Sequence, residues 1–526
     1  MRSGLRHRAR VLALALAGIA WAASGPASTR VPDGAERAFD AVSADRLRHH
    51  VETLASDAFA GRGVGHEGNR RAEEYIAASL REGGVAPAGD TYFQPVGLDH
   101  PSLGGDARLR IVDRNGTAIA DLTAGTEFCP LPESGDRDAS ARLVDAGYGI
   151  TAPELQHDDY ARVDARDAIV LVVEGTPDRL DYSRLPDAER AGFAGVERKR
   201  TDAERHGARG LLIVTSFVGD VHTIWPEHPS VRTATYRLAS ELETHPIAVA
   251  AISTRAAAPI RRALAARKML TATLTPGIVV NRVTVDNVLG FVEGAVPVKR
   301  DEMIVLGAHL DHDGLDAEGH IYHGADDNAS GTAAVLADAA AFADAAAHGW
   351  RPARGVVFAL WNGEEKGSLG AEEYVAAPVP RRRIVANINL DMVGRDEEIP
   401  DPDDWRFQGF PKTTAASSRN TLHVLGYSYT ADLARLIEDA NAATGLTILE
   451  DYDRGAQNLL RRSDNWAFLA HGIPAVFLTT GLHPDYHTPA DDADRLDYAK
   501  LERIAKLAAR AAWLAADGPP ARLTRR

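Results

Sequence analysis

The chain has a single cysteine, no long internal hydrophobic run and almost no clustering of basic residues. Cys129 cannot form an internal disulfide bond, and it is most simply explained as a small packing residue. No internal stretch reaches the roughly 20 apolar residues of a membrane-spanning helix. The net charge is −15, and no basic run is longer than three residues, as at 381–383. Because binding to a phosphate backbone requires a concentrated cationic face, we expect no nucleic acid among the partners.

The N-terminus has the pattern of an export signal. Four arginines within the first ten residues precede the apolar run Val11–Ala22, whose last three residues have the small-x-small form that signal peptidase reads. We predict a signal peptide over residues 1–22, a linker over 23–40, and export to the periplasm or the extracellular space. No stable membrane insertion is expected after cleavage. An uncleaved membrane anchor is the alternative, although the apolar run is short for a membrane span.

A length of 526 residues predicts two or three folded units. The first part is typical of mixed helix and strand, with a helical pattern over Arg70–Glu82 and a hairpin signal at Asn115-Gly116. Short strand-like runs then interleave with two helical segments and carry no cluster of His, Cys, Asp or Glu, which indicates an inserted β-rich module. The predicted boundaries are 41–139 and 276–518 for the main domain, 140–275 for the inserted module and 519–526 for a disordered tail.

Four apolar runs in the second half of the chain each lead to His, Asp or Glu. The runs and the residues that follow them are Met303–Ala308 with His309 and Asp311, Gly355–Trp361 with Glu364 and Glu365, Ile384–Leu390 with Asp391, and Pro474–Thr479 with Tyr486 and His487. An acidic loop with Asp326 and Asp327 precedes an alanine-rich helical pattern over Thr332–Phe342. Near-continuous apolar strands alternating with helices predict an α/β fold, a mostly parallel-centred sheet covered by helices on both faces. The polar residues should meet at its carboxyl edge.

This set of side chains indicates metal chemistry. The candidate ligands are two imidazoles and three carboxylates: His309, Asp327, Glu365, Asp391 and His487. Nitrogen and oxygen donors without a thiolate suit zinc and tolerate cobalt or manganese. Five ligands are one short of two three-ligand sites, so one carboxylate must bridge two ions. Glu364, next to a ligand, is placed to act as general base toward the attacking water.

Each of these residues also has an ordinary structural interpretation, as a strand-end histidine, a helix cap or a solvated charge pair. Their independent occurrence after four separate strands favours the metal site. The remaining histidines are interpreted as structural: His312, His320, His323, His423 and His471. His483 could line the site without binding a metal.

At these residues the sequence resembles the co-catalytic di-zinc exopeptidases, a family that includes secreted bacterial leucyl aminopeptidases, glutamate carboxypeptidases and the transferrin-receptor ectodomain. The matching motifs, in the order of the family, are Gly-Ala-His309-Leu-Asp311-His, Gly-Ala-Asp-Asp327-Asn-Ala-Ser-Gly, Asn-Gly-Glu364-Glu365-Lys-Gly, Asn-Leu-Asp391-Met-Val-Gly-Arg and Tyr486-His487-Thr-Pro. The resemblance covers the whole mature chain, with Gly61-Arg62-Gly63 as the N-terminal segment of the family. The inserted module is similar to a protease-associated domain.

The resemblance implies two zinc ions per chain. One would be bound by His309 and Asp391, the second by Glu365 and His487, with Asp327 bridging them. It further implies that Asp311 accepts a hydrogen bond from His309 and fixes its tautomer, and that Glu364 is the base. Tyr486 falls where some members use a tyrosine to stabilise the tetrahedral intermediate. One departure is Ser463-Asp464-Asn465, where many relatives have Ser-Asp-His, and it concerns the substrate pocket rather than the metals.

The resulting prediction is a secreted di-zinc metalloaminopeptidase that hydrolyses N-terminal residues from peptide substrates. A metallocarboxypeptidase of the same fold is the alternative, and a catalytically inactive binding ectodomain is disfavoured because no ligand is lost. Two ions would balance Asp327, Glu365, Asp391 and Glu364, which leaves Asp311 and Asp326 and favours a substrate ammonium. Four arginines could instead form a carboxylate clamp: Arg395, Arg454, Arg461 and Arg462.

Overall fold

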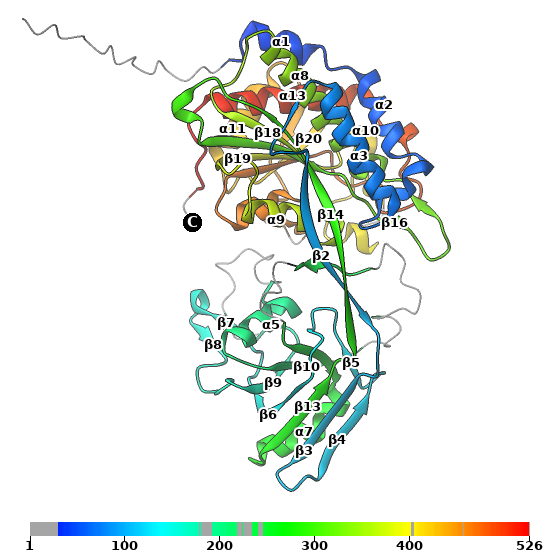
Figure 1. The fold of residues 1–526 in the computed structure, drawn as a ribbon, viewed down its shortest axis with the longest axis vertical. Helices are drawn as coiled ribbons and strands as arrows, with labels where there is room; N and C mark the ends of the chain where they lie inside the picture. The colour runs from blue at the N-terminus through cyan, green and yellow to red at the C-terminus, as the bar shows by residue number, and fades with distance from the viewer. Residues whose placement is uncertain are drawn as a thin grey trace, which may run out of the picture.

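The computed structural model describes residues 30–524 except 178–179, 181–191, 217, 219–223, 225–233, 240–245, 401–403 and 456. The predicted signal peptide lies outside the described residues. The chain forms a larger and a smaller lobe, joined by two long strands that pass from one to the other (Figure 1). These strands, β2 (Phe93–Leu103) and β14 (Ile278–Val292), pair antiparallel along most of their length. Within the described ranges, none of the helices combines the length and apolar character needed to cross a bilayer.

The larger lobe is built on a ten-stranded sheet with the order β11-β2-β14-β18-β15-β19-β22-β20-β21, to which β1 (Ala86–Pro87) adds beside β14. The two outermost strands are the short β11 (Arg237–Leu238) and β21 (Thr447–Leu449). Its four central strands run parallel: β18 (Gly355–Trp361), β15 (Glu302–His309), β19 (Arg383–Leu390) and β22 (Ala475–Thr479). The flanking strands β14 and β20 (Thr421–Leu425) pair antiparallel with them. The predicted α/β fold with a parallel-centred sheet is confirmed.

The central strands are continuously apolar because both faces of the sheet are covered. Along β15, Ile304 and Leu306 belong to one core, whereas Met303 and Val305 belong to the other. The first core is closed mainly by α2 (Ala44–Leu54), α3 (Glu67–Glu82), α8 (Gly331–Ala347), α11 (Ala431–Asn441) and α13 (Tyr498–Asp517). The second is closed by α9 (Leu369–Ala376) and α12 (Asn465–Ala470). The strand ends are thereby fixed from both sides.

Two terminal segments differ from the prediction. Part of the predicted linker forms helix α1 (Asp33–Asp40), whose Phe39 is fully buried with its ring centroid 5.0 Å from that of Phe342. The apolar face of this helix is short, so its periodicity is weak in the sequence. The predicted disordered tail also contacts the lobe, since the Thr524 amide donates to the Tyr429 carbonyl at 2.7 Å.

The smaller lobe contains an eight-stranded sheet with the order β4-β3-β13-β6-β9-β10-β12-β5. Its strands are β3 (Arg108–Asp113), β4 (Ala118–Thr123), β5 (Phe128–Pro130), β6 (Ala139–Asp145), β9 (Ala168–Val173), β10 (Gly210–Thr215), β12 (Ala248–Ser253) and β13 (Leu270–Thr275). Helices α5 (Val196–Arg205) and α7 (Thr254–Ala265) pack against separate clusters of this sheet.

Sheet membership places the start of this lobe before residue 140. Strands β3, β4 and β5, which we assigned to the main domain, hydrogen-bond within the smaller sheet. The reason is β13, which pairs antiparallel with both β3 and β6 and therefore joins the first hairpin to the later strands. Such pairing between distant segments leaves no local signal in the sequence.

One buried carboxylate in this framework affects stability. Asp338, on α8, is fully buried, and neither of its carboxylate oxygens has a hydrogen-bond partner among the described residues. Burial raises the pKa of Asp338 well above its usual value, while Arg510 opposes this shift. A carboxyl whose pKa is raised on folding destabilises the native state progressively as pH rises above its unfolded pKa of about 4.

We therefore predict that Asp338→Ala raises the melting temperature by roughly 2–5 °C near pH 8 and by less near pH 5. Asp344→Ala, at an exposed position of the same helix, is the matched control and should change little. Thermal unfolding of the purified variants at both pH values measures the effect. Equal gains at the two pH values, or a loss of stability in Asp338→Ala, would contradict this account.

Candidate metal centre

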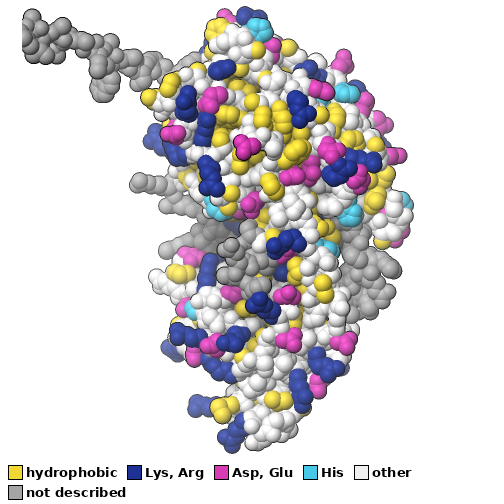
Figure 2. Space-filling model, in the orientation of Figure 1, with side chains coloured by type: hydrophobic (Ala, Val, Ile, Leu, Met, Phe, Trp, Pro, Cys, Tyr) yellow, Lys and Arg dark blue, Asp and Glu magenta, His cyan; other side chains and the backbone are white. Residues whose placement is uncertain are grey.

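A cluster of buried acidic side chains lies inside the larger lobe. On the face drawn in Figure 2, Lys and Arg side chains are interspersed with Asp and Glu side chains over both lobes. Buried carboxylates gather instead at the carboxyl ends of the parallel strands. His309 ends β15, Asp391 directly follows β19, and the turn η6 (Glu364–Lys366) follows β18. Asp327 belongs to the turn η5 (Ala325–Ser330) that leads into α8.

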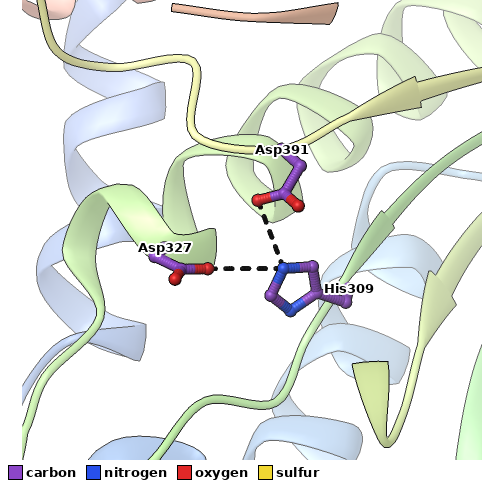
Figure 3. A group of neighbouring side chains, drawn as sticks. All are labelled: His309, Asp327 and Asp391. Carbon is purple, nitrogen blue, oxygen red and sulfur yellow. Dashed lines mark ion pairs between the residues drawn. The ribbon is translucent and has the colours of Figure 1, made fainter. Parts of the chain in front are cut away.

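The first group of side chains surrounds the Nε2 atom of His309. This atom lies 3.2 Å from Asp391 Oδ1 and 3.4 Å from Asp327 Oδ1, and both carboxylates point toward it from two different segments of the chain (Figure 3). Nδ1 of the same ring lies 3.2 Å from the backbone carbonyl of Asp311, which accepts its proton. Nε2 then carries the lone pair. A lone pair that faces two carboxylates is repulsive unless a cation lies between them, so the group fits a divalent ion.

A second group surrounds the Nε2 atom of His487. It lies 3.5 Å from Asp327 Oδ2 and 3.6 Å from Glu365 Oε2. Nδ1 of His487 donates to Asp313 Oδ2 at 2.7 Å, which again leaves the lone pair on Nε2 facing carboxylates. Asp327 thus directs one oxygen toward each histidine. A carboxylate shared in this way has the arrangement that a bridging ligand requires.

The pKa values of the two histidines also indicate a site for a cation. Burial lowers the pKa of His487, but the carboxylates of Glu365, Asp313 and Asp327 outweigh it and raise the pKa to about 10. The pKa of His309 is likewise raised well above its usual value, because Asp391 and Glu364 outweigh its burial. Each imidazole therefore requires a positive charge at Nε2, either a proton or a metal ion. Metal binding at these groups would release protons.

Two residues of the centre were not identified from the sequence. His312, interpreted as structural, is fully buried within the site, and its Nδ1 lies 2.7 Å from Glu365 Oε1. Asp313 orients His487 through the contact described above. Both hold the outer atom of a candidate ligand, which fixes the direction of its inner atom. The available signal was their position, within four residues of His309 in a run of three polar residues.

The role expected for Asp311 is also corrected in detail. Its carboxylate oxygen lies 3.9 Å from His309 Nδ1, too far for a hydrogen bond, and the backbone carbonyl of Asp311 takes that place. The carboxylate accepts instead from the backbone amides of Glu364 at 3.1 Å and Glu365 at 3.2 Å. Asp311 therefore couples the end of β15 to the turn that carries the candidate base.

A buried arginine supports the loop that contains Asp327. Arg62 is 1% exposed and donates to four backbone carbonyls at 2.7–2.9 Å, those of Leu54, Leu310, His323 and Gly324. Burial lowers the pKa of Arg62 to about 10, so it stays charged at neutral pH beside the buried carboxylates. Gly61 has a φ of 67°, and a Cβ there would lie 2.4 Å from the Tyr322 carbonyl. Gly61 is therefore required for the close approach of the backbone, and Arg62 is required for the hydrogen bonds to the loop.

Asp326 and Asp491 hold the same loop from the other side. The Asp491 carboxylate accepts from the backbone amides of Asp326 and Asp327 at 3.0 Å. Asp326 accepts from the Gly394 amide at 2.6 Å and lies 3.3 Å from His483 Nε2. His483 is fully buried in this contact and does not face the cavity.

The candidate base and the tyrosine lie at the cavity. Glu364 Oε2 is 3.8 Å from His309 Nε2, and burial raises the pKa of Glu364 well above its usual value. Burial also raises the pKa of Tyr486 well above its usual value, so its phenol is neutral and can donate a hydrogen bond. The Tyr486 ring lies edge-on to His487, with centroids 4.1 Å apart.

A cavity of about 330 Å³ opens beside both groups. Five members of the centre line it: Asp327, Glu364, Glu365, Asp391 and His487. A further part of the lining, the apolar wall, consists of Met392, Leu459, Trp466, Phe477 and Leu482. Arg461, Arg462 and Glu372 also line the cavity. The space is thus bounded by a candidate metal site, an apolar surface and charges of both signs.

Comparison with known proteins agrees with this geometry. Residues 287–512 match the model of Peptidase family M28. A probable glutamate carboxypeptidase of Arabidopsis thaliana is 29% identical over 219 residues, which cover 40% of this chain and 27% of that protein. A probable leucine aminopeptidase of Trichophyton verrucosum (strain HKI 0517) is 25% identical over 229 residues, which cover 41% of this chain and 55% of that protein. The chain spans about a quarter to a half of the length of these relatives.

Among solved structures, an aminopeptidase from Aneurinibacillus sp. strain AM-1 is similar, with a TM-score of 0.52 at 20% sequence identity over 93% of this chain and 97% of that chain. This likeness concerns the fold. The family match, by contrast, contains β15, β18, β19 and β22 together with the loops that carry every candidate ligand. The part of the chain that holds the candidate centre is therefore the part that matches peptidase family M28.

Proposed function

We propose that the protein is a secreted metalloaminopeptidase that holds two zinc ions and removes N-terminal residues from peptides. The observation that supports it most directly is the division of Asp327, with one carboxylate oxygen toward His309 and the other toward His487. His309 and Asp391 would hold one ion, and Glu365 and His487 the other. When bound, the ions supply Lewis acidity that polarises the scissile carbonyl and lowers the pKa of water.

The side chains of the chain carry the proton transfers. Glu364 accepts the proton of the attacking water at Oε2 and then delivers it to the leaving amine. Its turn is held by the Asp311 carboxylate, so the base has a fixed position relative to His309. Tyr486 donates its hydroxyl proton in a hydrogen bond to the oxyanion that develops on the carbonyl oxygen.

The charge balance of the sequence assigns the preference for a free N-terminus to Asp311 and Asp326, but other carboxylates line the cavity. Asp311 and Asp326 accept backbone amides within the protein and do not line the cavity. Glu364, Asp391 and Glu372 do line it. The two ions would balance Glu364 and Asp391, so Glu372 presents the negative charge to a substrate ammonium. The apolar wall suits the side chain of the N-terminal residue.

The smaller lobe is proposed to shape access to this cavity. Strand β11 (Arg237–Leu238) extends from the inserted segment and pairs with β2 in the sheet of the larger lobe. Leu238 belongs to a buried cluster against which Leu369 packs, and Leu369 directly follows the cavity residue Ser368. The inserted segment thus reaches the rim of the cavity. Its similarity to a protease-associated domain and the export of the protein remain parts of this proposal.

Glu364→Gln should retain metal and lose turnover. The substitution keeps the shape of the side chain and removes the proton acceptor, a change that typically costs about 10²–10⁴-fold in rate. Steady-state kinetics on a leucyl peptide, with metal analysis of the same sample, measures both properties. A variant that keeps more than about a tenth of the wild-type kcat would show that Glu364 is not the base.

Asp327→Ala should abolish tight binding of both ions, whereas His487→Ala should weaken mainly one. A bridging carboxylate both ligates the two ions and reduces their mutual repulsion, so its loss acts on both positions. The measurement is zinc content per chain after dialysis against a weak chelator, with circular dichroism as a control for folding. One tightly held ion in folded Asp327→Ala would exclude a bridge.

A matched set of peptides tests which end of the substrate is recognised. The set contains one peptide with both ends free, its N-acetylated form and its C-amidated form. We expect cleavage from the N-terminus to persist on amidation and to stop on acetylation, because the ammonium is required for register. Persistence on acetylation with loss on amidation would instead assign the protein to the carboxypeptidases.

A further inference from the structure

The four arginines that could contact a substrate carboxylate have different environments in the structure. Arg395 directs both terminal nitrogens at Asp485 Oδ2, each at 3.1 Å, so an internal carboxylate already occupies it. Arg454 is exposed and does not line the cavity. Arg461 and Arg462 both line it. The Arg461 guanidinium lies 4.0 Å from the centre of the Trp466 ring, in a stacked position at the cavity wall.

Arg462 differs from the others in its partners. It is exposed, and within the part of the chain that the structure describes, no carboxylate lies at ion-pair distance from it. Its nearest aromatic contact is weak, with the guanidinium carbon 5.9 Å from the centre of the Phe410 ring. It lines the same cavity as Tyr486 and Glu364. Since Arg462 lines the cavity, its donors are available to a ligand bound there.

The backbone that carries Arg462 is firmly held. The Arg462 amide donates to the Leu459 carbonyl at 3.0 Å and closes the short turn η8 (Leu459–Arg461). Asn465 Nδ2 donates to the Leu460 carbonyl at 2.9 Å. The next residue, Ser463, accepts from Asn389 Nδ2 at 2.8 Å, which ties the turn to β19 two residues before Asp391. The position of Arg462 relative to the centre is therefore set by the sheet.

The cavity has opposite charges along its walls. Glu372 and Arg462 both line the cavity, and the volume between the lining residues is about 330 Å³. That volume is at the lower end of the roughly 300–1,000 Å³ found for small-ligand pockets. A short peptide with both ends free also carries opposite charges a few ångströms apart. The cavity and such a peptide are thus complementary in both charge and size.

We propose that Arg462 binds a substrate carboxylate on the leaving side of the scissile bond, so that the protein prefers dipeptides and tripeptides with a free C-terminus. This inference rests on the proposed function and names its substrate class. The guanidinium matches a carboxylate through two parallel hydrogen bonds, and this match also fixes the orientation of the leaving residue. Longer peptides place their carboxylate beyond this position and lose the contact.

The experiment compares Leu-Gly, Leu-Gly amide and Leu-Asp amide as substrates of the full zinc-loaded protein. For the wild type we expect KM for Leu-Gly to be at least about tenfold lower than for Leu-Gly amide, since a hydrogen-bonded charge pair typically contributes that much or more. In Arg462→Gln the ratio of the two KM values should approach one. In Arg454→Gln, the matched control outside the cavity, the ratio should stay as in the wild type.

Leu-Asp amide identifies the source of the carboxylate. A low KM that Arg462→Gln raises would show that a side-chain carboxylate is recognised as well, which supports the same anchor. Equal wild-type KM values for Leu-Gly and its amide, or an unchanged ratio in Arg462→Gln, would overturn the proposal. In either case, cleavage of Leu-Gly amide by the wild type would leave the aminopeptidase assignment standing. Absence of cleavage of all three substrates would instead contradict the proposed function itself.

Discussion

The centre depends on the placement of one carboxylate between two imidazoles. Asp327 directs its two oxygens toward His309 and His487, and its own loop has no regular structure to hold it. The loop is fixed instead by two buried side chains. Arg62 donates to the carbonyl of Gly324 at the start of the loop, and the Asp491 carboxylate accepts from the Asp327 amide. Three formal charges are thus buried to position one ligand. Such burial is costly unless every charge has partners, and the hydrogen bonds described here supply them.

The sheet provides the second constraint. Parallel strands β15, β18, β19 and β22 end at one edge, so residues from four distant segments converge without long loops. The same register brings the turn with Arg462 to the cavity through the bond between Ser463 and Asn389. The proposed metal site, the proposed base and the proposed carboxylate anchor therefore share one rigid support. The long pair of strands β2 and β14 carries the smaller lobe, whose strand β11 returns to the sheet of the larger one (Figure 1).

The sequence predicted the parts of the molecule that have a local signal. Continuous apolar runs revealed the central strands, and their common direction implied that residues such as His309 and Asp391 would meet. Partners that act across the fold had no such signal. His312 is an ordinary histidine in the sequence, and only the packing of η6 against it shows that it holds Glu365. Likewise, the hairpin β3–β4 is locally clear, but its membership of the smaller sheet depends on pairing with β13, more than 140 residues later. 

Anomalous diffraction at the zinc absorption edge, from crystals of the zinc-loaded protein, tests the central claim most directly. The account predicts two separate peaks that flank Asp327. One should lie among His309, Asp391 and Asp327 Oδ1, and the other among His487, Glu365 and Asp327 Oδ2. A single peak, or a second peak bound by His312 with His487 turned away, would contradict the assignment of Asp327 as the shared ligand of a two-ion centre.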